Sequence, residues 1–235
     1  MVGGIRSIVR RMLDKYSWWL CKKEFQEQKF KRHNERPVEF AFLLGKIATL
    51  YPRTILDVGT GTTALPHLMR NCGCLVTAID NVTDYWPSGM TNRHYHVIDD
   101  DITDTGLSER FDLISCISVL EHIEDSASAV ENMFRLLAPG GHIVITCPYN
   151  EAQYIRNVYE LPGSSYGQNA PYITQAFCRA DVDGWLESSG GEIVDQEYWR
   201  YWDGEFWTIG KQVLPPQVVD RHGQHQLTCL LLKKS

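Results

Sequence analysis

The feature that most constrains the fold is a short apolar strand that runs directly into a glycine loop and then into a helix. Residues 54–58 read Thr-Ile-Leu-Asp-Val, Gly59-Thr60-Gly61 follow at once, and a helical pattern begins near residue 64. Glycines so placed let the backbone turn sharply and let a ligand lie against it without a Cβ in the way. Open α/β sheets bind ligands outside the carboxyl ends of their strands. The pattern therefore predicts an α/β fold with a ligand at this loop.

The rest of the chain alternates strand and helix. Expected strands cover residues 54–58, 75–79, 95–98, 111–117, 142–146, 193–199 and 227–232, and expected helices cover 38–50, 64–72, 126–137 and 178–189. Such alternation with short connections predicts a doubly wound, mostly parallel seven-stranded sheet. The two longest connections, 148–176 and 200–226, are rich in aromatic residues, and long connections in a compact domain are often binding loops.

The chain divides into a basic start and an acidic body. Residues 1–36 hold ten basic and four acidic residues (+6), and the remaining residues hold 13 and 25 (−12). Apolar residues from Ile5 to Leu20 recur at helical spacing, and a polar helical stretch follows to about residue 33. Pro37 marks a break. We expect a basic amphipathic helical extension over 1–36 and one domain over 37–235. The acidic body argues against a nucleic-acid partner.

Three roles remain open for the extension. It could cover the ligand cleft, make a peripheral contact with an anionic membrane through residues 5–23, or pack in a homodimer. Trp18-Trp19, followed by Lys22-Lys23, is typical of an interface. The chain is accordingly expected to be a monomer or a homodimer.

Seven cysteines are scattered and never spaced Cys-x-x-Cys, which favours reduced thiols and no zinc site. With no run of eighteen apolar residues, the expected location is the cytoplasm, with the inner face of the membrane as the alternative. The acidic run Asp99-Asp100-Asp101 is expected to be solvated, so no metal is predicted.

Two cofactors fit the glycine loop. Residues 59–64 also match the dinucleotide pattern G-x-G-x-x-A, and Asp80 follows about twenty residues later, as in an NAD(P)-dependent oxidoreductase. The carboxylates of Asp57, Asp80 and Asp101 would repel a pyrophosphate. S-adenosylmethionine carries an ammonium and a sulfonium, and these cations suit a site lined by carboxylates better.

Five segments in order resemble the class I S-adenosylmethionine-dependent methyltransferase superfamily across residues 50–147. They are Ile55-Leu56-Asp57-Val58-Gly59-Thr60-Gly61, Ala78-Ile79-Asp80, Asp101-Ile102, residues 111–123 with their Glu-His ending, and residues 136–146 with their Ala-Pro-Gly-Gly turn. One departure is Thr63, where the family's first motif often has a third glycine; the helix start is expected to shift.

This resemblance implies the cofactor site. Asp57, Gly59, Thr60 and Gly61 would form the loop, and Asp80 would hold the ribose hydroxyls, with Asn81 as a further cofactor-binding residue. Asp101 and Ile102 would meet the adenine, and the backbone of Ser118 would meet the methionine part.

Glu121, His122 and Tyr149 are the candidate catalytic residues. A hydroxyl acceptor must lose a proton, and histidine is suited to take it near neutral pH. Alternatively, Glu121 only holds the backbone and His122 begins a helix. The segments resemble bacterial methyltransferases of small molecules and surface polysaccharides, which implies O-methylation of a small-molecule or sugar-like (glycan) acceptor, with 148–176 and 200–226 as acceptor-side insertions. A non-catalytic cofactor-binding protein of the same fold is the remaining rival.

Overall fold

The computed structural model describes residues 2–30, 32–83, 85–86 and 89–234. It falls into two compact units, residues 1–36 and 37–235. The first unit is dominated by one helix, α1 (Val2–Glu27), in place of the two helical stretches expected. From Arg6 to Glu27 every side chain is exposed except Leu20, which is half-buried. Among the residues described, no helix combines enough length with enough apolar character to traverse a lipid bilayer.

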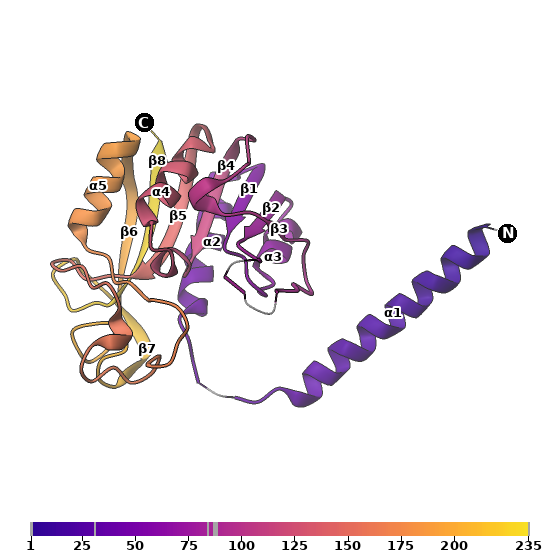
Figure 1. Cartoon of the computed structure of the whole chain (residues 1–235), viewed down its shortest axis with the longest axis horizontal. Helices are drawn as coiled ribbons and strands as arrows, with labels where there is room; N and C mark the ends of the chain where they lie inside the picture. The colour runs from indigo at the N-terminus through magenta and orange to yellow at the C-terminus, as the bar shows by residue number, and fades with distance from the viewer. Residues whose placement is uncertain (1, 31, 84, 87–88, 235) are drawn as a thin grey trace. The chain divides into compact units, whose positions relative to one another are not determined.

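The second unit alternates helices and strands (Figure 1). Its helices are α2 (Arg36–Leu50), α3 (Leu65–Asn71), α4 (Ser126–Arg135) and α5 (Arg179–Ser189), with 3-10 turns η1 (Ile102–Asp104), η2 (Leu120–His122) and η3 (Val158–Glu160). Its strands are β1 (Thr54–Val58), β2 (Leu75–Asp80), β3 (Ile98–Asp99), β4 (Phe111–Ile117), β5 (Leu137–Pro148), β6 (Gly191–Trp202), β7 (Gln212–Val219) and β8 (Leu227–Lys234).

The strands form one sheet in the order β3-β2-β1-β4-β5-β8-β6-β7. Strands β3, β2, β1, β4 and β5 are parallel, and β8 is antiparallel to both β5 and β6. The predicted doubly wound α/β fold is confirmed.

The expected count of seven strands is wrong by one, because β7 lies inside the 200–226 connection. Its Pro215 and Pro216 lack backbone donors, which hides it from a strand pattern. Prolines are tolerated there because β7 is an edge strand that pairs with β6 alone.

The third strand is shorter and later than the predicted 95–98. The side-chain oxygen of Asn92 accepts hydrogen bonds from the backbone nitrogens of His94 and Tyr95, at 2.7 and 2.8 Å. These bonds close a turn where the sequence predicted a strand, so pairing with β2 begins only at Ile98.

Both faces of the sheet are covered. Along β1, alternate residues enter two separate apolar clusters: Leu56 joins the cluster beneath α4 and α5, and Ile55 joins the cluster beneath α2 and α3. This alternation is the signature of a sheet buried on both sides.

The parallel register fixes where the site lies. Val58 at the end of β1 is level with Ile79 of β2 and Cys116 of β4. The residues that follow these three strands therefore meet at one edge of the sheet.

Candidate functional site

The glycine loop is pinned to the neighbouring strand. The backbone nitrogens of Gly59 and Thr60 donate to the carbonyl of Ile79 at 2.9 and 3.2 Å. Gly59 has φ +69°, and a Cβ there would lie 2.3 Å from the Val119 side chain, so no larger residue fits. On Gly61, at φ +56°, an added Cβ would lie 3.8 Å from the ring of Trp86, which is an ordinary van der Waals contact. A glycine is therefore favoured here by the positive φ and not by a lack of space for a side chain.

Asp57 braces this loop from inside the protein. Its buried carboxylate accepts hydrogen bonds from the hydroxyls of Thr60 and Ser115, each at 2.7 Å. These bonds tie the loop to β1 and β4. A direct contact between Asp57 and a cofactor stays a prediction.

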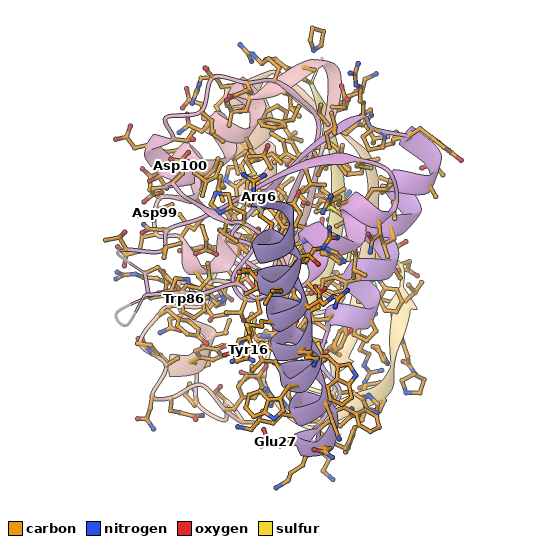
Figure 2. All side chains as sticks on the ribbon, turned by 90° about the vertical axis from the view of Figure 1, so that its right-hand side faces the viewer. Arg6, Tyr16, Glu27, Trp86, Asp99 and Asp100 are labelled. Atoms are coloured by element: carbon orange, nitrogen blue, oxygen red, sulfur yellow. The ribbon has the colours of Figure 1, made fainter. Side chains whose placement is uncertain are left out.

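Asp80 and the glycine loop come together as the sequence predicts. The carboxylate of Asp80, 7% exposed, accepts from the backbone nitrogen of Gly61 at 2.7 Å. Its other oxygen accepts from the indole nitrogen of Trp86 at 2.9 Å. Trp86, labelled in Figure 2, comes from the connection after β2, and the sequence did not single it out.

Asn92 links the connection after β2 to the glycine loop. Its side-chain nitrogen donates to the carbonyls of Gly61 and Thr63, at 2.8 and 2.9 Å. Since its oxygen also closes the turn at residues 94–95, Asn92 cross-links two segments.

Asp101 and Asn81 also meet. The side-chain nitrogen of Asn81 donates to Asp101 at 2.9 Å, and the other oxygen of Asp101 caps η1 through the backbone nitrogen of Thr103 at 2.8 Å. Ile102 is buried in the core cluster beneath α4. Asp99 bonds the Thr83 hydroxyl, which lowers the pKa of Asp99. The adenine contacts of Asp101 and Ile102 stay predictions.

Ser118 sits in a strained conformation at the end of β4, with φ +51°. Its hydroxyl donates to the buried carboxylate of Glu39 in α2 at 2.8 Å. The hydroxyl of Thr146 in β5 donates to the same oxygen at 2.8 Å. The side chain of Ser118, which the resemblance left without a role, thus anchors the strained turn.

Glu121 and His122 lie in η2, directly after this turn. The ring nitrogen Nδ1 of His122 is 2.8 Å from the carbonyl of Ile173. Because a carbonyl only accepts, Nδ1 carries the hydrogen in this bond, and Nε2 is left as the nitrogen that can take up a proton. Glu121 is 3% exposed, with an oxygen 3.9 Å from Nε2. The backbone nitrogen of Gln175 donates to the Glu121 carbonyl at 2.9 Å, which holds η2 against residues 173–175.

An exposed tyrosine, Tyr172, lies beside His122, and a second exposed tyrosine, Tyr85, lies beside Tyr172. The Tyr172 ring meets the imidazole edge-on, with centroids 4.7 Å apart, and the Tyr85 ring lies 6.0 Å from Tyr172. Partial burial raises the pKa of Tyr85, and the nearby Tyr172, Glu121 and Asp80 raise it further. Tyr85 therefore lies close enough to both the Asp80 carboxylate and Glu121 to feel their charges.

Tyr149 lies elsewhere. It is 1% exposed, and its hydroxyl donates to Glu151 at 2.8 Å. Its ring stacks on His225 and leans against Tyr198 of β6. This placement favours a structural role, and its catalytic role stays a prediction.

Several residues of the site were not predicted from the sequence. Glu39 left a usable signal, since it is a lone acid in the apolar run of residues 38–44. Tyr85, Trp86 and Asn92 left none, because the connection after β2 has no periodic pattern.

Comparisons with known proteins bear on the family and on the fold. The profile of a family described as "Methyltransferase domain" matches residues 25–203. A ubiquinone biosynthesis O-methyltransferase from Coxiella burnetii is 28% identical over 176 residues, 69% of this chain and 73% of that protein. A protein of the same name from Haemophilus ducreyi is 28% identical over 144 residues, 56% of this chain and 58% of that protein, so the match spans little more than half of the relative. The solved magnesium protoporphyrin IX methyltransferase from Synechocystis PCC 6803, with S-adenosylhomocysteine bound, shares the fold at a TM-score of 0.54 and 14% identity, covering 97% of this chain and 99% of that one.

Proposed function

This chain belongs to the methyltransferase-domain family, and we propose that it methylates an oxygen atom of a small, ring-shaped acceptor with His122 as the general base. It is a methyltransferase that depends on S-adenosylmethionine. The NAD(P)-dependent alternative, which the glycine loop alone left open, is set aside.

The residues at the sheet edge suit this cofactor. Its ammonium and sulfonium are cationic, and the edge presents the carboxylates of Asp80 and Glu121. Gly61 has no Cβ, so a ligand can approach its backbone beside the Trp86 ring. In this proposal Asp80 holds the ribose hydroxyls, with the strength of hydrogen bonds to a charged group. When bound, the cofactor supplies a methyl group whose bond to sulfur breaks as the acceptor attacks.

The geometry of His122 carries the proposal for an oxygen acceptor. An acceptor hydroxyl forms its new bond to the methyl carbon and releases its proton. Nε2 of His122 is oriented to take that proton, because Nδ1 is committed to the Ile173 carbonyl. Glu121, 3.9 Å from Nε2, would then stabilise the imidazolium. Positioning and exclusion of water supply much of the remaining rate.

Tyr85 and Tyr172 support a ring-shaped acceptor. Both rings are exposed, Tyr172 beside His122 and Tyr85 beside Tyr172, and aromatic faces suit flat or sugar-like molecules. The two relatives from Coxiella and Haemophilus carry the name O-methyltransferase, which favours oxygen as the methylated atom. A sugar-like acceptor in polysaccharide assembly finds no support among these names, so the proposal covers ring-shaped small molecules generally.

The test compares two substitutions of histidine. In His122→Asn the amide nitrogen can still donate to Ile173, but no base remains. We expect its turnover to fall about a hundredfold or more, the usual contribution of a general base, with an unchanged dissociation constant for S-adenosylhomocysteine. His94→Asn, at an exposed histidine, is the matched control and should keep full turnover. Normal turnover in His122→Asn removes the base from the mechanism.

The acceptor is sought by release of S-adenosylhomocysteine across phenols, sugars, amines and thiols. Methylation of hydroxyl compounds supports the proposal, and transfer confined to nitrogen or sulfur acceptors contradicts it. Tight cofactor binding with no transfer to any class would favour the non-catalytic alternative.

A further inference from the structure

Helix α1 exposes an apolar face that the proposed reaction does not use. Six residues at helical spacing form this face, with exposed fractions from 50% to 66%: Ile8, Val9, Met12, Leu13, Tyr16 and Trp19. Figure 2 marks the length of the helix by Arg6, Tyr16 and Glu27. An exposed apolar stripe of this length signals an interaction surface.

Cations flank the apolar face. Residues 5–23 hold six basic residues and one acidic residue, which gives +5. At 100° per residue, Arg6 and Arg10 fall on one border of the stripe, and Lys15 and Lys22 fall on the other. Trp18 lies off the stripe, where the Lys22 ammonium covers its ring at 5.1 Å.

We infer that α1 binds the surface of an anionic membrane and lies in its plane. The apolar face would enter the boundary of the acyl chains, with Tyr16 and Trp19 at the level of the headgroups. Cations on both borders would reach lipid phosphates while their apolar stems stay against the bilayer.

Other occupants fit this face less well. A second copy of α1 would bring two segments of charge +5 together, and their mutual repulsion opposes pairing. A nucleic acid would take up the cations but leave the apolar stripe exposed to water. A lipid surface takes up both the apolar face and the cations that flank it.

Flotation of the full chain with vesicles tests this inference. Vesicles of phosphatidylcholine alone are compared with vesicles of phosphatidylcholine and phosphatidylglycerol in equal parts. We expect the chain to float with the anionic vesicles and to be released progressively by salt, because the cations contribute through a screened attraction. No flotation with anionic vesicles overturns the inference.

Two substitutions with the same charge change separate the apolar face from general electrostatics. Leu13→Glu places a carboxylate within the stripe, and we expect about a tenfold or greater loss of vesicle partitioning. Ser7→Glu places the same charge on the opposite side of the helix and should lose about fivefold at most. Equal losses in the two variants overturn the docking geometry.

Two further measurements identify the rival occupants. If the full chain is a dimer that Leu13→Glu dissociates while neither protein floats, a second copy covers the face and the inference is wrong. If Leu13→Glu instead weakens S-adenosylhomocysteine binding in the absence of lipid, with no flotation of the parent chain, the helix serves the cofactor cleft. Unchanged cofactor affinity with lost flotation supports the membrane assignment.

Discussion

Asn92 offers the sharpest test of how the cofactor loop is held. Asn92→Asp keeps the oxygen that closes the turn at residues 94–95 but replaces the donor to Gly61 and Thr63 with a second acceptor. Asn92→Ala removes both functions. In each variant the two loop carbonyls lose their side-chain donor.

The structure sets the size of the effect. Two neutral hydrogen bonds contribute about 1–3 kcal/mol in net terms. The loop keeps its bonds from Gly59 and Thr60 to Ile79 and from Gly61 to Asp80, and these bonds still hold it partly in place. Only part of the lost free energy of about 1–3 kcal/mol should therefore appear as weaker cofactor binding. We expect the dissociation constant for S-adenosylhomocysteine to rise about tenfold in Asn92→Ala, which corresponds to roughly 1.4 kcal/mol. Asn92→Asp should be at least as weak, because its added oxygen faces two carbonyls.

Calorimetric titration with S-adenosylhomocysteine measures the effect, and thermal unfolding without ligand monitors the fold. Asn150→Ala is the matched control. The oxygen of Asn150 also closes a turn, through the backbone nitrogens of Ala152 and Gln153, but in the connection after β5. Affinity within twofold of the parent chain in Asn92→Ala, or an equal loss in Asn150→Ala, would refute the role of Asn92 in positioning the loop.

Two further predictions follow from the packing. Gly59→Ala should abolish cofactor binding and destabilise the fold by more than Gly61→Ala, because its Cβ meets Val119 at 2.3 Å, whereas Gly61 has only the cost of a positive φ, about 1–2 kcal/mol; equal melting temperatures would contradict this. His225 is 5% exposed and burial lowers its pKa, so its neutral form is the one the fold favours. Its contribution to stability is therefore present above the unfolded pKa of about 6.5 and is lost as the pH falls through the lower folded value. His225→Asn can keep the donor to Gly223, and we expect a smaller loss of melting temperature on acidification from about pH 7.5 to about pH 5.5 than in the parent chain. His222→Asn, at an exposed histidine, is the control, and its melting temperature should fall on acidification by as much as that of the parent chain.

The sequence predicted the central sheet because buried parallel strands are apolar runs of limited length. Strands β1 and β4 were predicted at the same bounds as observed. The errors fall where side chains override the pattern. At β3, Asn92 takes the backbone donors that a strand would use, and at β7 two prolines disguise an edge strand.

The candidate site, like the fold, could be predicted from the sequence only in part. The ends of β1, β2 and β4 could be placed together from topology alone, because parallel strands end at one edge. The side chains that bond the residues after these strands could not be predicted in this way. Glu39 reaches Ser118 across 79 residues, and Asn92 reaches Gly61 across 31, and neither contact leaves a local pattern in the chain.

The departure at Thr63 has a physical explanation in these long-range contacts. In the described structure Thr63 is not among the residues with positive φ, so its position requires no glycine. Its hydroxyl donates to the Thr60 carbonyl at 2.9 Å, and α3 begins at Leu65, one residue later than the sequence predicted. The Thr63 carbonyl, which precedes the helix, is one of the two that Asn92 bonds. A hydroxyl and a distant amide thus hold the helix start in place, and the requirement for positive φ falls on Gly59 and Gly61 alone within the loop.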